Sequence, residues 1–83
     1  MKESEFHKLQ PGDRIRSPRE PGRVLTIITI QTDCDYTTEP PTPYTWAFEA
    51  RELRDSGEPV PQTYIYVKLE DADALRHELV ANT

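Results

Sequence analysis

A run of β-branched residues enclosed by turns constrains the fold of this chain more than any other feature. Residues 24–30 read Val-Leu-Thr-Ile-Ile-Thr-Ile, a composition typical of a strand. Before them, residues 17–22 hold two prolines and a glycine, and residues 11–13 read Pro-Gly-Asp, which is strong turn chemistry. Residues 14–16 alternate polar and apolar. The segment therefore predicts a short strand, a hairpin connection and a long second strand.

The long strand is apolar on both of its faces. Val24, Ile28 and Ile30 share one face under strict alternation, whereas Leu25 and Ile27 share the other. Apolar residues on both faces are typical of strands that are covered on both sides. The pattern predicts a central strand, or one that curves so that its inward face changes along its length.

Three segments carry a resemblance to a known class of domain. Residues 9–15 (Leu-Gln-Pro-Gly-Asp-Arg-Ile) and 22–27 (Gly-Arg-Val-Leu-Thr-Ile) resemble the first two strands of small SH3-like β-barrels, of the kind found in short uncharacterised actinobacterial and phage proteins. Residues 46–53 resemble their third strand and the turn after it. The resemblance implies a small barrel of five strands. Its motifs are structural and carry over no functional residue.

Two further strands are expected in the second half. Tyr44, Trp46 and Phe48 fall on one face of residues 44–50, and we predict that Trp46 and Phe48 belong to the core; the alternative is an aromatic platform for a base or a peptide. In residues 63–69 the aliphatic side chains should face the core and the two tyrosines should face outward.

The C-terminal segment predicts a helix. Ala72, Leu75 and Leu79 make a narrow apolar stripe at helical spacing over residues 71–81, too short to be stable unless it docks. The predicted fold is thus mainly β: a single domain, residues 1–83, with four to five antiparallel strands, among them 13–17, 22–32, 44–50 and 63–69, and one C-terminal α-helix. An SH3-like barrel is preferred over an open sheet covered by the helix.

Length and cysteine content restrict the function. Eighty-three residues are too few for a substrate domain plus a cofactor domain. No apolar run approaches the roughly 20 residues that span a bilayer, so no membrane partner is expected. The one cysteine, Cys34, fits a reducing compartment, and we expect a cytoplasmic protein.

Catalytic and metal-site signatures are missing from the sequence. There is no glycine-rich phosphate loop, no Ser/His/Asp arrangement with plausible flanks and no Cys/His cluster. His7, His77 and Cys34 have no second ligand at metal-site spacing. We therefore expect no enzyme activity, no cofactor and no metal.

The charge of the chain distinguishes between the two remaining kinds of function, protein binding and nucleic-acid binding. The formal net charge is −5, and residues 31–83 hold eleven Asp and Glu against four Lys and Arg. An acidic surface lacks the charge that supplies most nonspecific nucleic-acid affinity. The alternative is a small barrel that binds nucleic acid through the first hairpin. Its basic residues are Arg14, Arg16, Arg19 and Arg23.

A protein partner is accordingly the main expectation. Residues 33–43 (Asp-Cys-Asp-Tyr-Thr-Thr-Glu-Pro-Pro-Thr-Pro) show no core-forming pattern and predict a long exposed loop, and loops on a small scaffold often carry binding residues. We expect a protein-binding module, such as a phage or mobile-element accessory regulator or inhibitor. Its expected contact residues are Tyr36, Glu39, Glu49, Glu52, Asp55 and Glu58.

Overall fold

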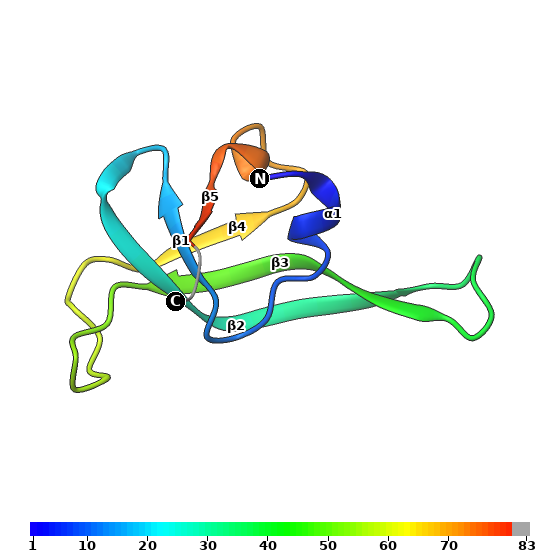
Figure 1. Cartoon of the computed structure of the whole chain (residues 1–83), viewed down its shortest axis with the longest axis horizontal. Helices are drawn as coiled ribbons and strands as arrows, with labels where there is room; N and C mark the ends of the chain where they lie inside the picture. Colours follow the sequence, from blue (N-terminus) through cyan, green and yellow to red (C-terminus); the bar gives the residue numbers. More distant parts are fainter. Residues whose placement is uncertain (81–83) are drawn as a thin grey trace.

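The structure is a computed structural model that describes residues 1–80, and these form one antiparallel five-stranded sheet (Figure 1). The strand order is β4-β3-β2-β1-β5. A four-residue helix precedes β1, and a 3-10 turn precedes β5. The mainly β, antiparallel prediction is confirmed. The elements are α1 (Glu3–Phe6), β1 (Arg14–Ser17), β2 (Glu20–Asp35), β3 (Thr42–Arg51), β4 (Ile65–Lys68), η1 (Ala74–Arg76) and β5 (Glu78–Val80).

The long strand β2 lies at the centre of the sheet and changes its inward face at a bulge. Ile27 stands opposite Ala50, and the next pairing joins Thr29 to Glu49, so Ile28 is an extra residue on β2. A bulge bends its strand and reverses the alternation of side chains beyond it. Ile27 is buried before the bulge, whereas Ile28 is 39% exposed. The prediction of a central strand whose inward face changes is confirmed.

A second bulge decides which aromatic side chain of β3 is buried. β3 pairs with β2 at Ala47 and next at Thr45, so Trp46 is the extra residue. Thr45 and Phe48 consequently both lie on buried positions, and Trp46 is half-buried and outside the core cluster. The prediction that Phe48 belongs to the core is confirmed, and the same prediction for Trp46 is wrong.

The core lies inside the bend of the sheet, under α1 and η1. Phe6 of α1 packs on Phe48 with ring centroids 5.5 Å apart. Ile65 and Leu69 pack against the edge of the cluster, as expected for the inward side of residues 63–69. The buried cluster consists of Phe6, Leu9, Ile15, Leu25, Ile27, Phe48, Ala50, Val67 and Ala74.

The predicted C-terminal helix is not formed. Within the described part of residues 71–81, the chain makes the short turn η1 and then β5, which pairs with β1 through Ile15 and Leu79. Without β5, the outer edge of β1 would present unpaired backbone groups, and strand pairing satisfies them. Leu75 and Leu79 are both exposed, so the apolar stripe does not dock. Residue 81 lies outside the described residues.

The sheet is open in the described residues. β4 and β5 are its two edges, and each pairs with one neighbour only among residues 1–80. The preferred barrel closure is therefore not shown by these pairings, although Figure 1 shows β1 and β5 crossing over β3 and β4 because the sheet bends sharply.

Candidate functional site

A two-stranded arm projects from the body of the protein. β2 and β3 continue past the core as the pairs Asp33–Tyr44, Cys34–Pro43 and Asp35–Thr42, so only residues 36–41 form the connection. We call residues 33–44 the arm; in Figure 1 it extends far to the right of the other elements. The prediction that residues 33–43 form a long loop is wrong at both ends. Proline is tolerated at Pro43 because each strand of a two-stranded arm is also an edge strand.

The tip of the arm is held in one shape by its own polar side chains. Asp35 Oδ1 accepts hydrogen bonds from Thr37 N at 2.9 Å and Thr37 Oγ1 at 2.5 Å. These two bonds, the side-chain bond first, hold the pKa of Asp35 below its ordinary value. Thr38 Oγ1 donates toward the carbonyl oxygens of Asp35 and Pro40 and lies 2.7 Å from Thr42 Oγ1. The tip is therefore pre-organised.

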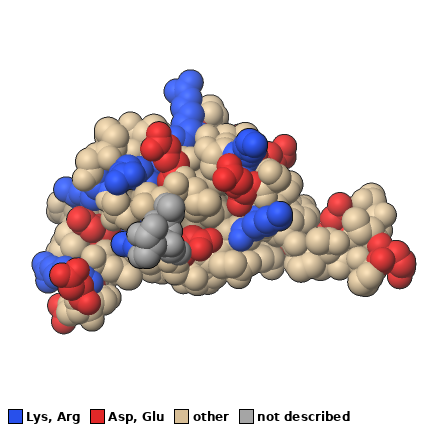
Figure 2. Space-filling model, in the orientation of Figure 1, with Lys and Arg blue, Asp and Glu red and all other residues tan. Residues whose placement is uncertain are grey.

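The side chains that the tip presents are acidic and aromatic. Tyr36 is 77% exposed. Asp33, Asp35 and Glu39 all lie in the arm, and residues 33–44 contain no lysine or arginine. Figure 2 shows the same division, with acidic atoms at the far end of the arm and the basic residues on the body.

A hollow of about 660 Å³ lies where the arm leaves the body. One wall comes from α1 and the residues after it, including His7, and the other comes from the arm, including Tyr36, Pro43 and Tyr44. The rings of His7 and Tyr44 meet edge to face with centroids 5.1 Å apart. A smaller hollow of about 410 Å³ adjoins it, and its lining includes Tyr44 and Trp46. Both hollows combine aromatic rings with charged and polar side chains, so they could contact a partner through both kinds of group.

The connection after α1 is tied to β3, which fixes the wall of the hollow. Thr45 N donates to the carbonyl oxygen of His7 at 2.9 Å, and Thr45 Oγ1 donates to that of Leu9 at 2.8 Å. His7 also lies 3.9 Å from a carboxylate oxygen of Glu3, one turn earlier. None of the predicted contact residues comes from the segment before residue 11. The sequence signal that could have indicated its position is the pair of apolar residues Phe6 and Leu9, which are both buried and anchor the segment to the core.

The expected acidic contact residues are not brought together. Tyr36 and Glu39 are at the tip of the arm, whereas Glu52, Asp55 and Glu58 lie in or beside the β3–β4 connection, at the opposite end of the molecule in Figure 1. Glu49 lies on β3 between the two ends.

Three of these carboxylates already have partners. Glu49 accepts a hydrogen bond of 2.9 Å from the Tyr64 hydroxyl. Glu52 lies 3.5 Å from the guanidinium of Arg23, and Glu58 lies 3.7 Å from that of Arg54. The arm is therefore the part of the predicted surface that is most available for contact.

The four arginines of the first hairpin are likewise divided. Arg14 and Arg16 lie on the exposed side of β1, where their neighbours in β5 are Val80 and Glu78. Arg19 pairs with Asp73 at 3.3 Å, and Arg23 pairs with Glu20 at 3.2 Å as well as with Glu52. Ion pairing with carboxylates reduces the positive potential that phosphates require.

Residues 1–80 contain no cluster of three or more His, Cys, Asp or Glu side chains placed to hold a metal ion. No helix in that same range is long and apolar enough to cross a membrane. Comparison of the chain with protein-family models, with curated proteins and with solved structures found no match.

Proposed function

We propose that the protein is a non-catalytic protein-binding module that contacts its partner with the tip of the arm and the hollow at its base. The observation that supports this is a pre-organised arm that contributes nothing to the core: no residue from 33 to 44 belongs to the buried cluster. An isolated two-stranded hairpin is marginally stable in water, so an arm of this kind gains from a partner surface.

The chemistry of the arm indicates the kind of partner. Tyrosine is enriched at interface hot spots because it combines a large apolar area with few rotatable bonds. The carboxylates around Tyr36 favour a basic surface and should make association depend on salt. A partner side chain that packs against the rings of His7 and Tyr44 would use the hollow as well.

The proposal also includes a more specific fold, an SH3-like barrel. Support for an SH3-like barrel comes from the return of β5 to the free edge of β1 and from the bulged, bent β2. A role as a phage or mobile-element accessory regulator or inhibitor fits a small acidic binding module. The single Cys34, without a disulfide partner in residues 1–80, favours a cytoplasmic location.

Site-specific crosslinking tests the contact surface. A photo-reactive benzoylphenylalanine replaces Tyr36 in one variant and Ser56, in the opposite connection, in a matched control. Crosslinking in cells of the source organism should attach a defined protein at position 36 and not at position 56. That product should disappear when Glu39→Lys is added, and should persist when Glu58→Lys is added. A product confined to position 56 would refute the proposed surface.

Nucleic acid is the competing partner, and Arg14 and Arg16 on the exposed side of β1 would bind it. A gel shift with random duplex DNA at physiological salt distinguishes nucleic-acid binding from protein binding. We expect no retention at nanomolar protein, because the net charge of −5 opposes the phosphate backbone. Retention that Arg14→Ala with Arg16→Ala abolishes would favour the nucleic-acid function.

A further inference from the structure

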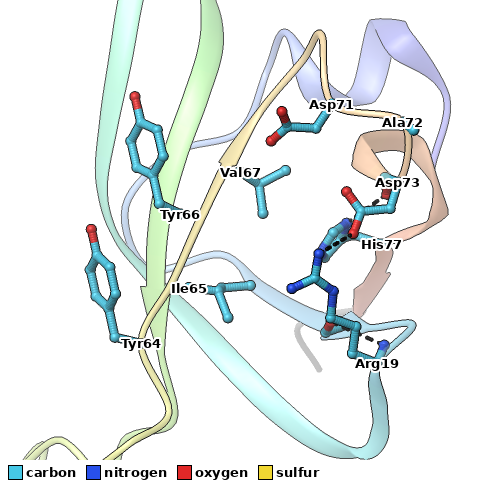
Figure 3. Close-up of a pocket in the computed structure, with 10 residues that line it drawn as sticks. Arg19, Tyr64, Ile65, Tyr66, Val67, Asp71, Ala72, Asp73 and His77 are labelled. Carbon is cyan, nitrogen blue, oxygen red and sulfur yellow. Dashed lines mark hydrogen bonds and ion pairs between the residues drawn. The ribbon is translucent and has the colours of Figure 1, made fainter.

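A second hollow, of about 670 Å³, lies between the edge strand β4 on one side and the β1–β2 turn and the segment around η1 on the other (Figure 3). Its lining includes four consecutive residues, Tyr64 to Val67, on one side, and Arg19, Asp73 and His77 on the other. Successive side chains of a strand point to opposite faces. A hollow that contacts four consecutive residues therefore runs along the edge of β4, and we call it the edge groove. In Figure 3, Ile65 and Val67 point toward the groove and the two tyrosines point away from it.

The main-chain groups of Tyr66 are directed toward the edge groove. Leu69 N donates to the carbonyl oxygen of Trp46 on β3, so the odd-numbered residues of β4 direct their main-chain groups toward β3. The even-numbered residues face the other way: Lys68 N donates to Asp71 Oδ2 at 2.9 Å, and the carbonyl oxygen of Lys68 accepts from Asp71 N at 3.0 Å. Lys68 is thus satisfied by the turn that follows. Among residues 1–80, no such turn follows Tyr66 and no strand lies on that side of it to pair with its main-chain N–H and C=O groups.

The charged groups of the groove favour a basic ligand. Asp71 and Asp73 supply two carboxylates, and Arg19 supplies the one Lys or Arg among the residues that line the groove. Arg19 is paired with Asp73, and Figure 3 shows this pair standing across the groove from β4. The second carboxylate, that of Asp71, accepts a hydrogen bond from the backbone N–H of Lys68, and no ion pair of the described residues includes it.

His77 is a buried member of the lining. It is 2% exposed, and its Nδ1 lies 3.0 Å from the carbonyl oxygen of Asp73 and 3.2 Å from that of Ala74. Carbonyl oxygens only accept, so Nδ1 carries a proton and these contacts hold the ring in one orientation.

We propose that the edge groove binds an extended, basic peptide segment of a partner protein, which adds to β4 as a further strand. The N–H and C=O of Tyr66 pair with the peptide backbone. An apolar side chain of the peptide packs on Ile65 and Val67, and a lysine or arginine side chain faces the carboxylates of Asp71 and Asp73. This site lies apart from the arm and is a second contact surface.

The length of the groove fits such a segment. Its lining includes four consecutive residues, Tyr64 to Val67, so an added strand of about the same length can lie beside them.

Nuclear magnetic resonance with defined peptides tests the proposal. The probe is a capped six-residue peptide of alternating lysine and valine, and the charge control replaces each lysine by glutamate. At about ten times Kd, the lysine peptide should slow exchange of the Tyr66 amide with solvent about tenfold, because only the free fraction exchanges. Asp73→Asn should weaken binding about fivefold, the effect of one partly exposed ion pair, while Asp55→Asn leaves it unchanged.

Three results would overturn the proposal. One is binding of the lysine peptide without slower exchange at Tyr66. Another is equal binding of the glutamate peptide. The third is slow Tyr66 exchange that appears without peptide and increases with protein concentration, since that would mean edge pairing between two copies of the chain. Tyr36→Ala should not affect peptide binding in the edge groove. The test of the edge groove is therefore independent of the function proposed for the arm.

Discussion

Phe48 and Trp46 are two positions apart in β3 and occupy different environments. Phe48 is fully buried between the rings of Phe6 and His77, whereas Trp46 is the half-buried extra residue of a bulge. We expect Phe48→Ala to lower the free energy of unfolding by about 3–5 kcal/mol, and Trp46→Ala by less than half as much. Urea unfolding followed by far-ultraviolet circular dichroism measures both, because Trp46→Ala removes the only tryptophan fluorophore.

If Phe48→Ala leaves too little folded protein, Phe48→Leu serves as a milder variant, with a smaller loss in the same direction. Equal losses for the Phe48 and Trp46 variants would contradict the bulged register of β3.

Tyr64 reports on the outer face of β3 and β4. Its hydroxyl donates to Glu49, and this hydrogen bond is the main cause that raises the pKa of Tyr64 above its ordinary value of 10.0. The bond favours the neutral phenol, so its stabilising contribution is present below the unfolded-state pKa and is lost as the pH rises through the folded-state pKa. Glu49→Gln should lower the pKa of Tyr64, as measured by NMR titration of ring-labelled tyrosine, and Glu58→Gln should not.

Among the elements, the arm is the part that the core does not need. Asp33 and Tyr44 are cross-strand neighbours, so a two-residue Asn-Gly turn can replace residues 34–43 between them. We expect the free energy of unfolding to change by less than about 1 kcal/mol, because none of the replaced side chains belongs to the core. Urea unfolding tests this.

The same replacement should abolish the partner contact proposed for the arm, and it should leave peptide binding in the edge groove intact. A loss of several kcal/mol would show instead that the arm supports the fold.

At the scale of the whole molecule, the arm makes the protein elongated. Its principal extents are 41 × 26 × 24 Å and its radius of gyration is 13.2 Å. A compact chain of this length has a radius of gyration of about 12 Å. Small-angle X-ray scattering should therefore give a value that falls by about 1 Å when Asn-Gly replaces residues 34–43. No change would mean that the arm folds back on the body in solution.

The sequence by itself determined the mainly β class, the antiparallel strands and the central place of β2. These follow from local chemistry: prolines and glycines terminate strands, and β-branched residues fill them. It also singled out residues 33–43 and Tyr36 as a contact surface, which remains a prediction. The buried position of Val67 followed from alternation, which also placed Phe48 in the core together with Trp46.

Only the tertiary structure decided the bulges, the arm and the last strand. Strict alternation cannot indicate where an extra residue enters a strand, so it placed Trp46 in the core and gave Ile28 the same apolar face as Ile30, although Ile28 is 39% exposed. Residues 33–43 pair as an arm because each strand supplies the other's hydrogen bonds, a property of two segments together and of neither alone. Likewise, residues 78–80 belong to a segment with a helical apolar stripe, yet they form β5. The reason is that the unpaired edge of β1 offers backbone hydrogen bonds, whereas a short isolated helix is unstable.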